Sequence, residues 1–228
     1  MSLWQDDPKL EAPVAQAVDV VFRIQCKQLP VDHAEPLASS LLTIAPWMEN
    51  LPYVGIHSVH VAGSQNGWER PDDSLGERLM LSKRTRLRIR MPLSHADQLV
   101  DALSHSQLSI SGEPMAILSG TVRPFEPITN LFARSCHFGK PADPELDESE
   151  FTQKVVSHCL EIGFSPNKIL CGKSRTIYCG EGPIYGRSVL IADIPPQYSL
   201  KLQEVGIGSG QLLGCGILLP HKDTAAVS

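Results

Sequence analysis

The sequence predicts an α+β protein built from two consecutive units with one element order, strand–helix–strand–strand–helix–strand. Strand-like and helix-like apolar periodicity alternate in the same succession in both halves. The two prolines within residues 123–127 suit a stiff connector between the halves. At 228 residues the chain can bury a core in each unit. We therefore expect two tandem ferredoxin-like (RRM-like, βαββαβ) domains, at 16–123 and 128–222, after a flexible N-terminal arm at 1–15.

The first unit is predicted around one alternating strand, residues 79–91. Near its end apolar residues alternate with arginines, with Leu87, Ile89 and Met91 against Arg86, Arg88 and Arg90. This pattern indicates a half-buried strand with one basic face. Ser94, with Asp97 three residues later, is expected to cap a helix that runs to 104. The remaining elements are strands at 18–26 and 54–62, a helix at 33–48, and strand material at 108–122 that is broken by Gly112 and Pro114.

The second unit repeats this order without evident sequence similarity to the first. Asp147 and Glu150 have the spacing of a capping box and predict a helix that runs to 162. Residues 180–183, Gly-Glu-Gly-Pro, predict the turn of a hairpin. The remaining elements are strands at 131–138, 168–179, 184–194 and 212–219 and a short helix at 196–205.

Composition limits the classes of function. A net charge of −5 and a pI near 5.9 exclude a protein that coats nucleic acid indiscriminately, so any positive charge that binds an anion has to be local. The six cysteines lack C-x-x-C spacing, and neither a leader nor a run of 18 apolar residues is evident. We expect a reduced cytoplasmic protein with no membrane contact, no metal site and no cofactor.

Positive charge is concentrated in one segment. Six of the 20 lysines and arginines lie between Arg78 and Arg90. Alternate side chains on a strand face can reach successive phosphates, so Arg84, Arg86, Arg88 and Arg90 are expected to bind RNA or another phosphate-rich partner. The alternative is an ordinary edge strand protected by charge. A second basic group, Lys173 and Arg175 near Lys168, is a weaker candidate.

A glycine-rich segment near the C-terminus is the most informative motif. Five glycines fall within eleven positions: Gly206, Gly208, Gly210, Gly214 and Gly216. Glycines permit a positive φ and a close approach of the backbone, with N–H groups presented to an anion. A dinucleotide fingerprint is excluded because no βαβ unit follows, and a P-loop at Gly172-Lys173-Ser174 lacks the glycine it needs at position 167. An ordinary flexible hairpin turn is the alternative.

The glycine-rich segment resembles that of the CRISPR RNA-processing endoribonucleases, Cas family six, in the variant first named for myxobacterial CRISPR systems. The resemblance covers residues 17–222 and rests further on these segments: Leu29-Pro30-Val31-Asp32-His33, Val54-Gly55-Ile56-His57, residues 199–204 before the glycines, and Leu219-Pro220. Residues 75–79, Leu-Gly-Glu-Arg-Leu, are also similar to a segment of the compact subtype I-F enzymes. The resemblance implies cleavage by the RNA's own 2′-hydroxyl, leaving a 2′,3′-cyclic phosphate, without metal.

Two histidines are candidates for the general base. His33 lies at a predicted helix start, where the dipole favours the neutral imidazole that accepts a proton, and the resemblance places the family's histidine there. His57 is the alternative base or an RNA contact. His57 and His60 point to opposite faces of a strand and so cannot form a metal pair. Ser174 is a candidate helper from elsewhere in the fold, and the second catalytic partner is left open.

These observations predict a metal-independent endoribonuclease that binds the stem-loop of CRISPR repeat RNA and cleaves precursor crRNA. The protein is also a candidate to join other Cas subunits in an effector complex. One alternative is a non-catalytic repeat-RNA-binding or scaffold subunit on the same fold. The other is a small-molecule enzyme that uses the glycine-rich segment to bind a phosphorylated metabolite, which would leave the arginine strand unexplained.

Overall fold

The structure is a computed structural model that describes residues 15–60 and 78–221. The predicted N-terminal arm lies outside the described residues apart from its last position. So do residues 61 and 62 of one predicted strand, and residues 75–77 of the segment that is similar to subtype I-F enzymes. Among the helices that are described, none has the length and apolar character needed to span a membrane.

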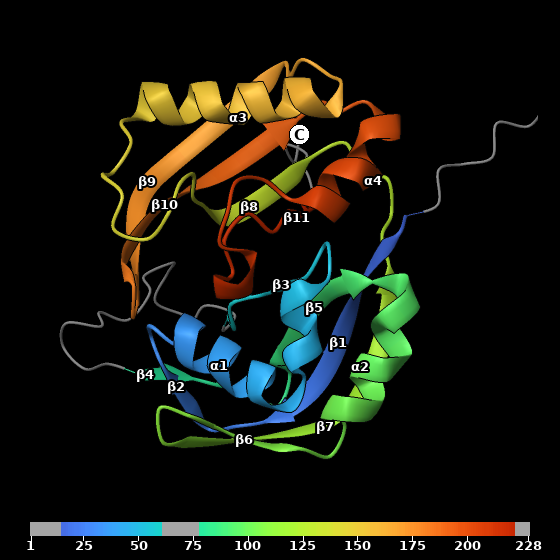
Figure 1. The fold of residues 1–228 in the computed structure, drawn as a ribbon. Coiled ribbons are helices and arrows are strands. Elements are labelled where there is room, and N and C mark those ends of the chain that lie inside the picture. Colours follow the sequence, from blue (N-terminus) through green and yellow to red (C-terminus); the bar gives the residue numbers. More distant parts are fainter. Residues whose placement is uncertain (1–14, 61–77, 222–228) are drawn as a thin grey trace, which may run out of the picture.

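The N-terminal unit confirms the predicted ferredoxin-like topology. Its main sheet has the order β3-β5-β1-β7-β6 with every pair antiparallel, and α1 and α2 cover one face (Figure 1). A two-stranded ribbon, β2-β4, is added beside it. The elements are β1 (Ala17–Gln25), β2 (Gln28–Pro30), α1 (Ala34–Ile44), η1 (Pro46–Asn50), β3 (Gly55–Ile56), β4 (Arg78–Met80), β5 (Arg86–Pro92), η3 (Leu93–His95), α2 (Ala96–Leu103), β6 (Gln107–Ile110) and β7 (Glu113–Pro124).

The C-terminal unit has the equivalent topology, with the sheet order β11-β8-β10-β9 and α3 lying across one face (Figure 1). Asp147 and Glu150 form the predicted capping box at the start of α3. The elements are β8 (Leu131–Cys136), α3 (Glu148–Ile162), β9 (Lys168–Cys179), β10 (Gly182–Ala192), α4 (Pro196–Val205), η4 (Gln211–Leu213) and β11 (Leu219–Pro220).

Several predicted elements differ from the structure. The strand expected at 79–91 is two strands, β4 and β5, joined by a turn. The break expected within 108–122 does occur at Gly112, which lies in the turn of the hairpin β6–β7. The cap of α2 is His95 rather than Ser94, whose hydroxyl contacts the His95 ring instead. The strand expected at 212–219 is wrong: η4 and irregular backbone fill most of it, because the glycines at 210, 214 and 216 turn the chain with positive φ.

Each unit has its own apolar core. In the N-terminal unit the core lies between α1, α2 and the inward residues of the sheet, among them Phe22, Leu87 and Ile89. In the C-terminal unit it lies between α3 and its sheet, around Val155, Val189 and Ile191. The glycine-rich segment lies between the two units and contacts α1 and β3 (Figure 1). The chain therefore places its most distinctive motif at the boundary between the halves.

Candidate functional site

The predicted basic face exists, and the strand register shows what shares it. Directly paired residues of antiparallel strands project to one side of a sheet. Arg90 pairs with Asp19 and Gly55, and the backbone N–H of His57 donates to the Arg88 carbonyl oxygen at 3.0 Å. We call the side of the N-terminal sheet that carries Arg86, Arg88 and Arg90, opposite α1 and α2, the arginine face. His57 belongs to this face.

Asp19 lies at the end of the arginine face where Arg90 is. It is 5 % exposed, and three basic side chains surround its carboxylate. Arg90 Nε donates to Oδ1 at 3.0 Å, Arg88 Nη1 lies 3.5 Å from Oδ2, and His57 Nε2 lies 3.4 Å from Oδ1. The contact of His57 is close but falls outside hydrogen-bond geometry. One buried carboxylate thus joins three of the side chains that the sequence singled out.

The electrostatics of this cluster favour an ionised Asp19 and a neutral His57. Burial alone would raise the pKa of Asp19, but the adjacent His57 ring and the charge of Arg90 hold that pKa well below its usual range. Burial lowers the pKa of His57, and the charges of Arg90 and Arg88 add to this against the opposing effect of Asp19. His57 is therefore neutral at pH 7, the form in which an imidazole can accept a proton.

The structure contradicts the prediction that Arg90 binds RNA. Arg90 is 2 % exposed, and besides Asp19 its guanidinium donates to two carbonyl oxygens of the C-terminal half: Gln203 O, at 2.5 Å, and Leu218 O, at 2.9 Å. Its guanidinium carbon also lies 4.6 Å from the ring centroid of Phe125 in the connector. Its three nitrogens are engaged inside the protein, so Arg90 joins the two halves.

The other arginines of this segment reach solvent. Arg86 is exposed and donates to the nearby backbone carbonyls of Lys83 and Thr85, and the side chain of Arg88 is 41 % exposed. Arg84 is exposed on the turn between β4 and β5 rather than on the strand. The edge-strand alternative is wrong for the end of β5 at Ile89 and Arg90, which pairs with β3 on one side and with β1 on the other.

His33, the first choice for the base, is engaged in structural hydrogen bonds. It is 1 % exposed, Nδ1 donates to Pro30 O at 2.9 Å, and Nε2 accepts from the Val59 N–H at 2.9 Å. Neither nitrogen is left to accept a proton from RNA in this arrangement. Because Val59 lies two residues after His57, the bond from His33 fixes the segment that carries the alternative base.

The glycine-rich segment needs its glycines for the predicted conformation, since all five have φ between 68° and 82°. The close approaches, however, are made to the protein itself. A Cβ on Gly208 or Gly216 would lie 2.1 Å from a backbone oxygen, of His137 and Ile207 respectively. A Cβ on Gly214 would lie 2.4 Å from Ser58 Oγ, next to His57. The segment is thus docked on β8 and on the β3 end of the arginine face.

Hydrogen bonds to protein carbonyls hold most of this segment in place. The N–H groups of Ile207, Ser209 and Gly216 donate to Gly216 O, His137 O and Ser135 O. Gly206 and Gly216 are buried, so they do not contact RNA as predicted, while Gly208, Gly210 and Gly214 are partly exposed. The main role of the motif in this fold is structural, because it packs between β8 and β3.

The second basic group and the candidate helper Ser174 lie on β9, in the sheet of the C-terminal unit. In β9, Ser174 pairs with Arg187 and Arg175 pairs with Gly186 of β10, and Lys173 lies beside them. In the described part of the chain, no hydrogen bond or ion pair joins these three residues to Asp19 or His57. The structure does not bring Ser174 together with either candidate base. Arg134 lies near this group. Partial burial lowers its pKa, and the charge of Arg175 lowers it further.

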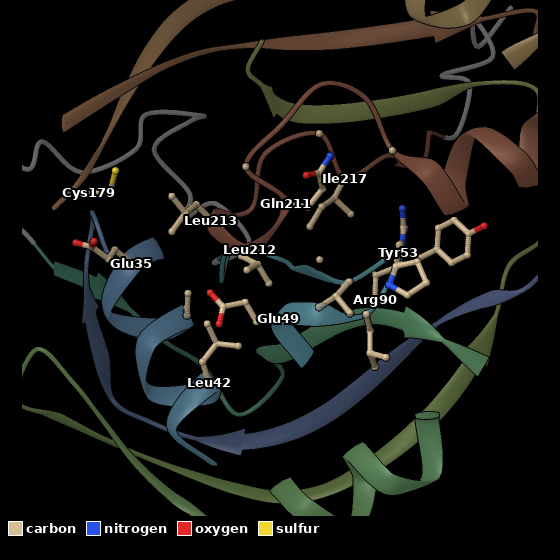
Figure 2. A pocket seen from close by; sticks show the side chains of 18 of the residues that line it. Glu35, Leu42, Glu49, Tyr53, Arg90, Cys179, Gln211, Leu212, Leu213 and Ile217 are labelled. Atoms are coloured by element: carbon tan, nitrogen blue, oxygen red, sulfur yellow. The ribbon is translucent and has the colours of Figure 1, made fainter. Parts of the chain in front are cut away.

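A pocket of about 690 Å³ opens between α1, η1 and the glycine-rich segment. Figure 2 shows Leu212 and Leu213 on the glycine-rich segment opposite Glu35 and Glu49 of the α1 side. Glu181 and Glu204 also line it. Among the described residues that line it, Arg90 is the only lysine or arginine, and its guanidinium is already engaged. Four carboxylates repel phosphate, so this pocket does not support the alternative of an enzyme that binds a phosphorylated metabolite. No group of three potential metal ligands occurs among the residues that the structure describes.

Asp19 is the functional candidate that sequence reasoning missed. The signal was present: a single acidic residue stands in the apolar strand sequence Ala-Val-Asp-Val-Val-Phe, and a carboxylate in such a strand needs a cationic partner. Its partner, Arg90, lies 71 residues later, and only the strand register brings the two together.

Comparison with known proteins agrees with this architecture. The family model for Cas6 CRISPR proteins matches residues 18–223. A curated relative from Myxococcus xanthus, named CRISPR-associated endonuclease Cas6, is 28 % identical over 210 residues, which are 92 % of this chain and 84 % of the relative.

Solved structures with the same fold include a Cas6-related protein from Pyrococcus furiosus, with a TM-score of 0.62 and 14 % identity over 91 % of this chain and all of that one. A second is Thermus thermophilus Cse3 bound to an RNA that represents a pre-cleavage complex, with a TM-score of 0.52 and 12 % identity over 90 % of this chain and 98 % of that one. The family model spans almost all of the described residues, and the chain belongs to the Cas6 family of CRISPR proteins.

Proposed function

We propose that this protein is an endoribonuclease that binds CRISPR repeat RNA and cleaves precursor crRNA without a metal ion. Attack of the 2′-hydroxyl on the adjacent phosphate yields a 2′,3′-cyclic phosphate and a 5′-hydroxyl. Membership in the Cas6 family, the name of the Myxococcus relative and the RNA bound to the Thermus neighbour support the proposal. The single observation that carries it is the clustering of a neutral histidine, an ionised carboxylate and solvent-reaching arginines on one sheet face.

In this proposal His57 is the general base, in place of His33. The ionised Asp19 faces His57 Nε2 and so favours the tautomer that carries its proton there, which leaves the lone pair on Nδ1. Nδ1 accepts the proton of the 2′-hydroxyl as that oxygen attacks the phosphorus. Since burial lowers the pKa of His57, the reaction rate should rise with pH around an inflection below the ordinary histidine value of about 6.5.

Arg88 stabilises the charge that develops on the phosphate. Its side chain is half-exposed, carries a guanidinium that fits phosphate oxygens, and is oriented by its ion pair with Asp19. His33 acts as a positioning residue: its bond to the Val59 N–H holds the backbone next to His57. Arg84 and Arg86 continue the binding surface away from the reacting phosphate.

The test is cleavage of labelled repeat RNA by the full chain in excess EDTA, followed by a substrate with a 2′-deoxy sugar on the nucleotide upstream of the cut. The proposal predicts undiminished cleavage in chelator, a cyclic-phosphate product, and no cleavage of the 2′-deoxy RNA, which should still bind. Strict dependence on Mg²⁺ contradicts the mechanism. Tight binding with no cleavage under any condition would instead establish the alternative of a non-catalytic repeat-RNA-binding subunit.

A further inference from the structure

The arginine face extends beyond β5 across two more strands. In the β1–β5 and β1–β7 ladders, Arg23 lies opposite Arg86 and Ser119, and Asp19 lies opposite Arg90 and Arg123. Between these rows, Val21 lies opposite Arg88 and Thr121. Gly120, one residue away, projects to the other side, where a Cβ would meet the Phe22 ring in the core. Arg23 and Arg123 therefore share a face with Arg86 and Arg88.

This wider surface carries positive charge that the protein does not neutralise. Arg23, Arg86 and Arg123 are exposed, and within the described ranges none of them forms an ion pair. Arg23 and Arg86 are directly opposite, an arrangement in which like charges destabilise a sheet. On a chain with a net charge of −5, this grouping is complementary to a polyanion.

The side chains also indicate the form of the polyanion. From the Arg86 row to the Arg90 row, no position on this face of β1, β5 and β7 is aromatic. Proteins that hold unpaired RNA stack its bases on aromatic rings, whereas paired RNA is recognised through its phosphates and 2′-hydroxyls. Ser119 and Thr121 supply hydroxyl groups among the arginines. The ring of Phe125, which follows β7, packs on the Arg90 guanidinium, so these rows of the face suit the backbone of paired RNA better than unpaired bases.

We infer that Arg23 and Arg123, with Arg86 and Arg88, form a platform that binds the phosphate backbone of paired RNA independently of its sequence. This deepens the proposed function and rests on it, because the platform would hold the stem of the substrate beside His57. The two arginines bind and do not react, since they lie on β1 and β7, away from β3, which leads to His57. Arg88, in contrast, contacts the reacting phosphate in the proposed mechanism.

The test measures binding of a blunt RNA duplex of unrelated sequence, over a salt series, to the full chain and to the double variant Arg23→Gln with Arg123→Gln. Glutamine keeps the side-chain stem and removes the charge. Loss of two phosphate contacts should weaken binding roughly tenfold or more and make the salt slope less steep by about 1.5. The matched control, Lys140→Ala with Lys154→Ala, removes two exposed charges from the C-terminal half and should change neither quantity.

The outcomes separate this inference from the proposed function. Arg23→Lys with Arg123→Lys should recover most of the duplex affinity, because lysine restores both positive charges. In the double glutamine variant, duplex affinity and salt slope that equal those of the wild type overturn the inference, as does an equal loss of affinity for the same strand unpaired. If the double glutamine variant loses duplex binding but the wild type cleaves no RNA, the platform is supported and the proposed endoribonuclease activity is refuted.

Discussion

The two ends of the arginine face have the same sequence pattern and opposite surroundings. Arg86 and Arg90 lie four residues apart on β5 and project to the same side of the sheet. Arg86 is exposed and has no carboxylate partner within the described residues, while Arg90 is 2 % exposed and joins Asp19 to the C-terminal half. One end of the face is open to solvent, where we propose that RNA binds, and the other is a joint between the two units.

The difference shows what alternation can and cannot predict. Strand periodicity fixes the side to which a residue projects, because successive side chains alternate between the faces of a sheet. What covers that side is decided elsewhere: the two carbonyl oxygens on Arg90 belong to residues 113 and 128 positions later. His57, next to the joint, lies where the covered end meets the open one.

The largest expected effect is on the joint. Arg90→Ala should lower the free energy of unfolding by about 3–5 kcal/mol, because it leaves the buried Asp19 carboxylate without its hydrogen-bonded partner. Urea unfolding followed by circular dichroism measures this loss. A change below 1 kcal/mol would show that Arg90 is not the joint, and RNA binding by Arg90 would have to be reconsidered.

A second test concerns the other contact between the halves, the glycine-rich segment. Gly208→Ala should cost about 2–3 kcal/mol, since it adds strain at φ 73° and drives a Cβ into His137 O, which accepts the Ser209 N–H. Gly112→Ala is the matched control: its φ is 83° but nothing lies within 4 Å of its Cβ, so only the strain of about 1 kcal/mol applies. Equal losses in the two variants would mean that the docking of the segment contributes nothing.

The charge of Asp19 gives the joint a pH dependence. A carboxyl group with a depressed pKa in the folded state stabilises the protein above its unfolded pKa, near 3.8, and this contribution is lost as the pH falls below that value. The free energy of unfolding of the wild type should therefore exceed that of Asp19→Asn by about 2 kcal/mol at pH 7. This difference should shrink as the pH falls below 3.8. Urea titrations at pH 7, 5 and 3 measure this difference. If the stability difference between wild type and Asp19→Asn did not change with pH, the charge of Asp19 would not stabilise the fold.

The smallest expected effect is at the open end. Arg86→Ala should change the unfolding free energy by less than about 0.5 kcal/mol, because an exposed side chain without an ion pair has little to lose. It should nevertheless weaken RNA binding and lower the salt slope by about one. Comparison with Arg90→Ala in the same assays separates the two ends. A stability loss as large as that of Arg90→Ala would make the whole face structural.

Local and regular features of the fold were predictable from the sequence. The capping box at Asp147 and Glu150 depends on residues three apart, and the succession of strands and helices in both units follows from periodicity. The strand at 212–219 was mispredicted because its apolar residues suggested extended backbone, whereas the glycines around them hold a compact turn.

The candidate site was predictable only in part. The arginine face followed from alternation, but the burial of Arg90 and the engagement of both nitrogens of His33 depend on partners that are distant in sequence. The same holds for Asp19, whose importance lies in a cross-strand pair. Residue type and spacing therefore indicated which sheet face carries the proposed site, and the packing of the halves decided which of its residues remain exposed.

The central claim is that His57, at the boundary of the open and covered ends, is the general base. Single-turnover cleavage of repeat RNA at saturating protein tests it most directly, with RNA affinity and thermal unfolding measured on the same samples of wild type, His57→Ala and His33→Ala. The account predicts that His57→Ala slows cleavage by about 10²- to 10⁴-fold at nearly unchanged affinity, while His33→Ala mainly lowers stability. Wild-type cleavage by His57→Ala, together with an inactive but folded His33→Ala, would contradict it.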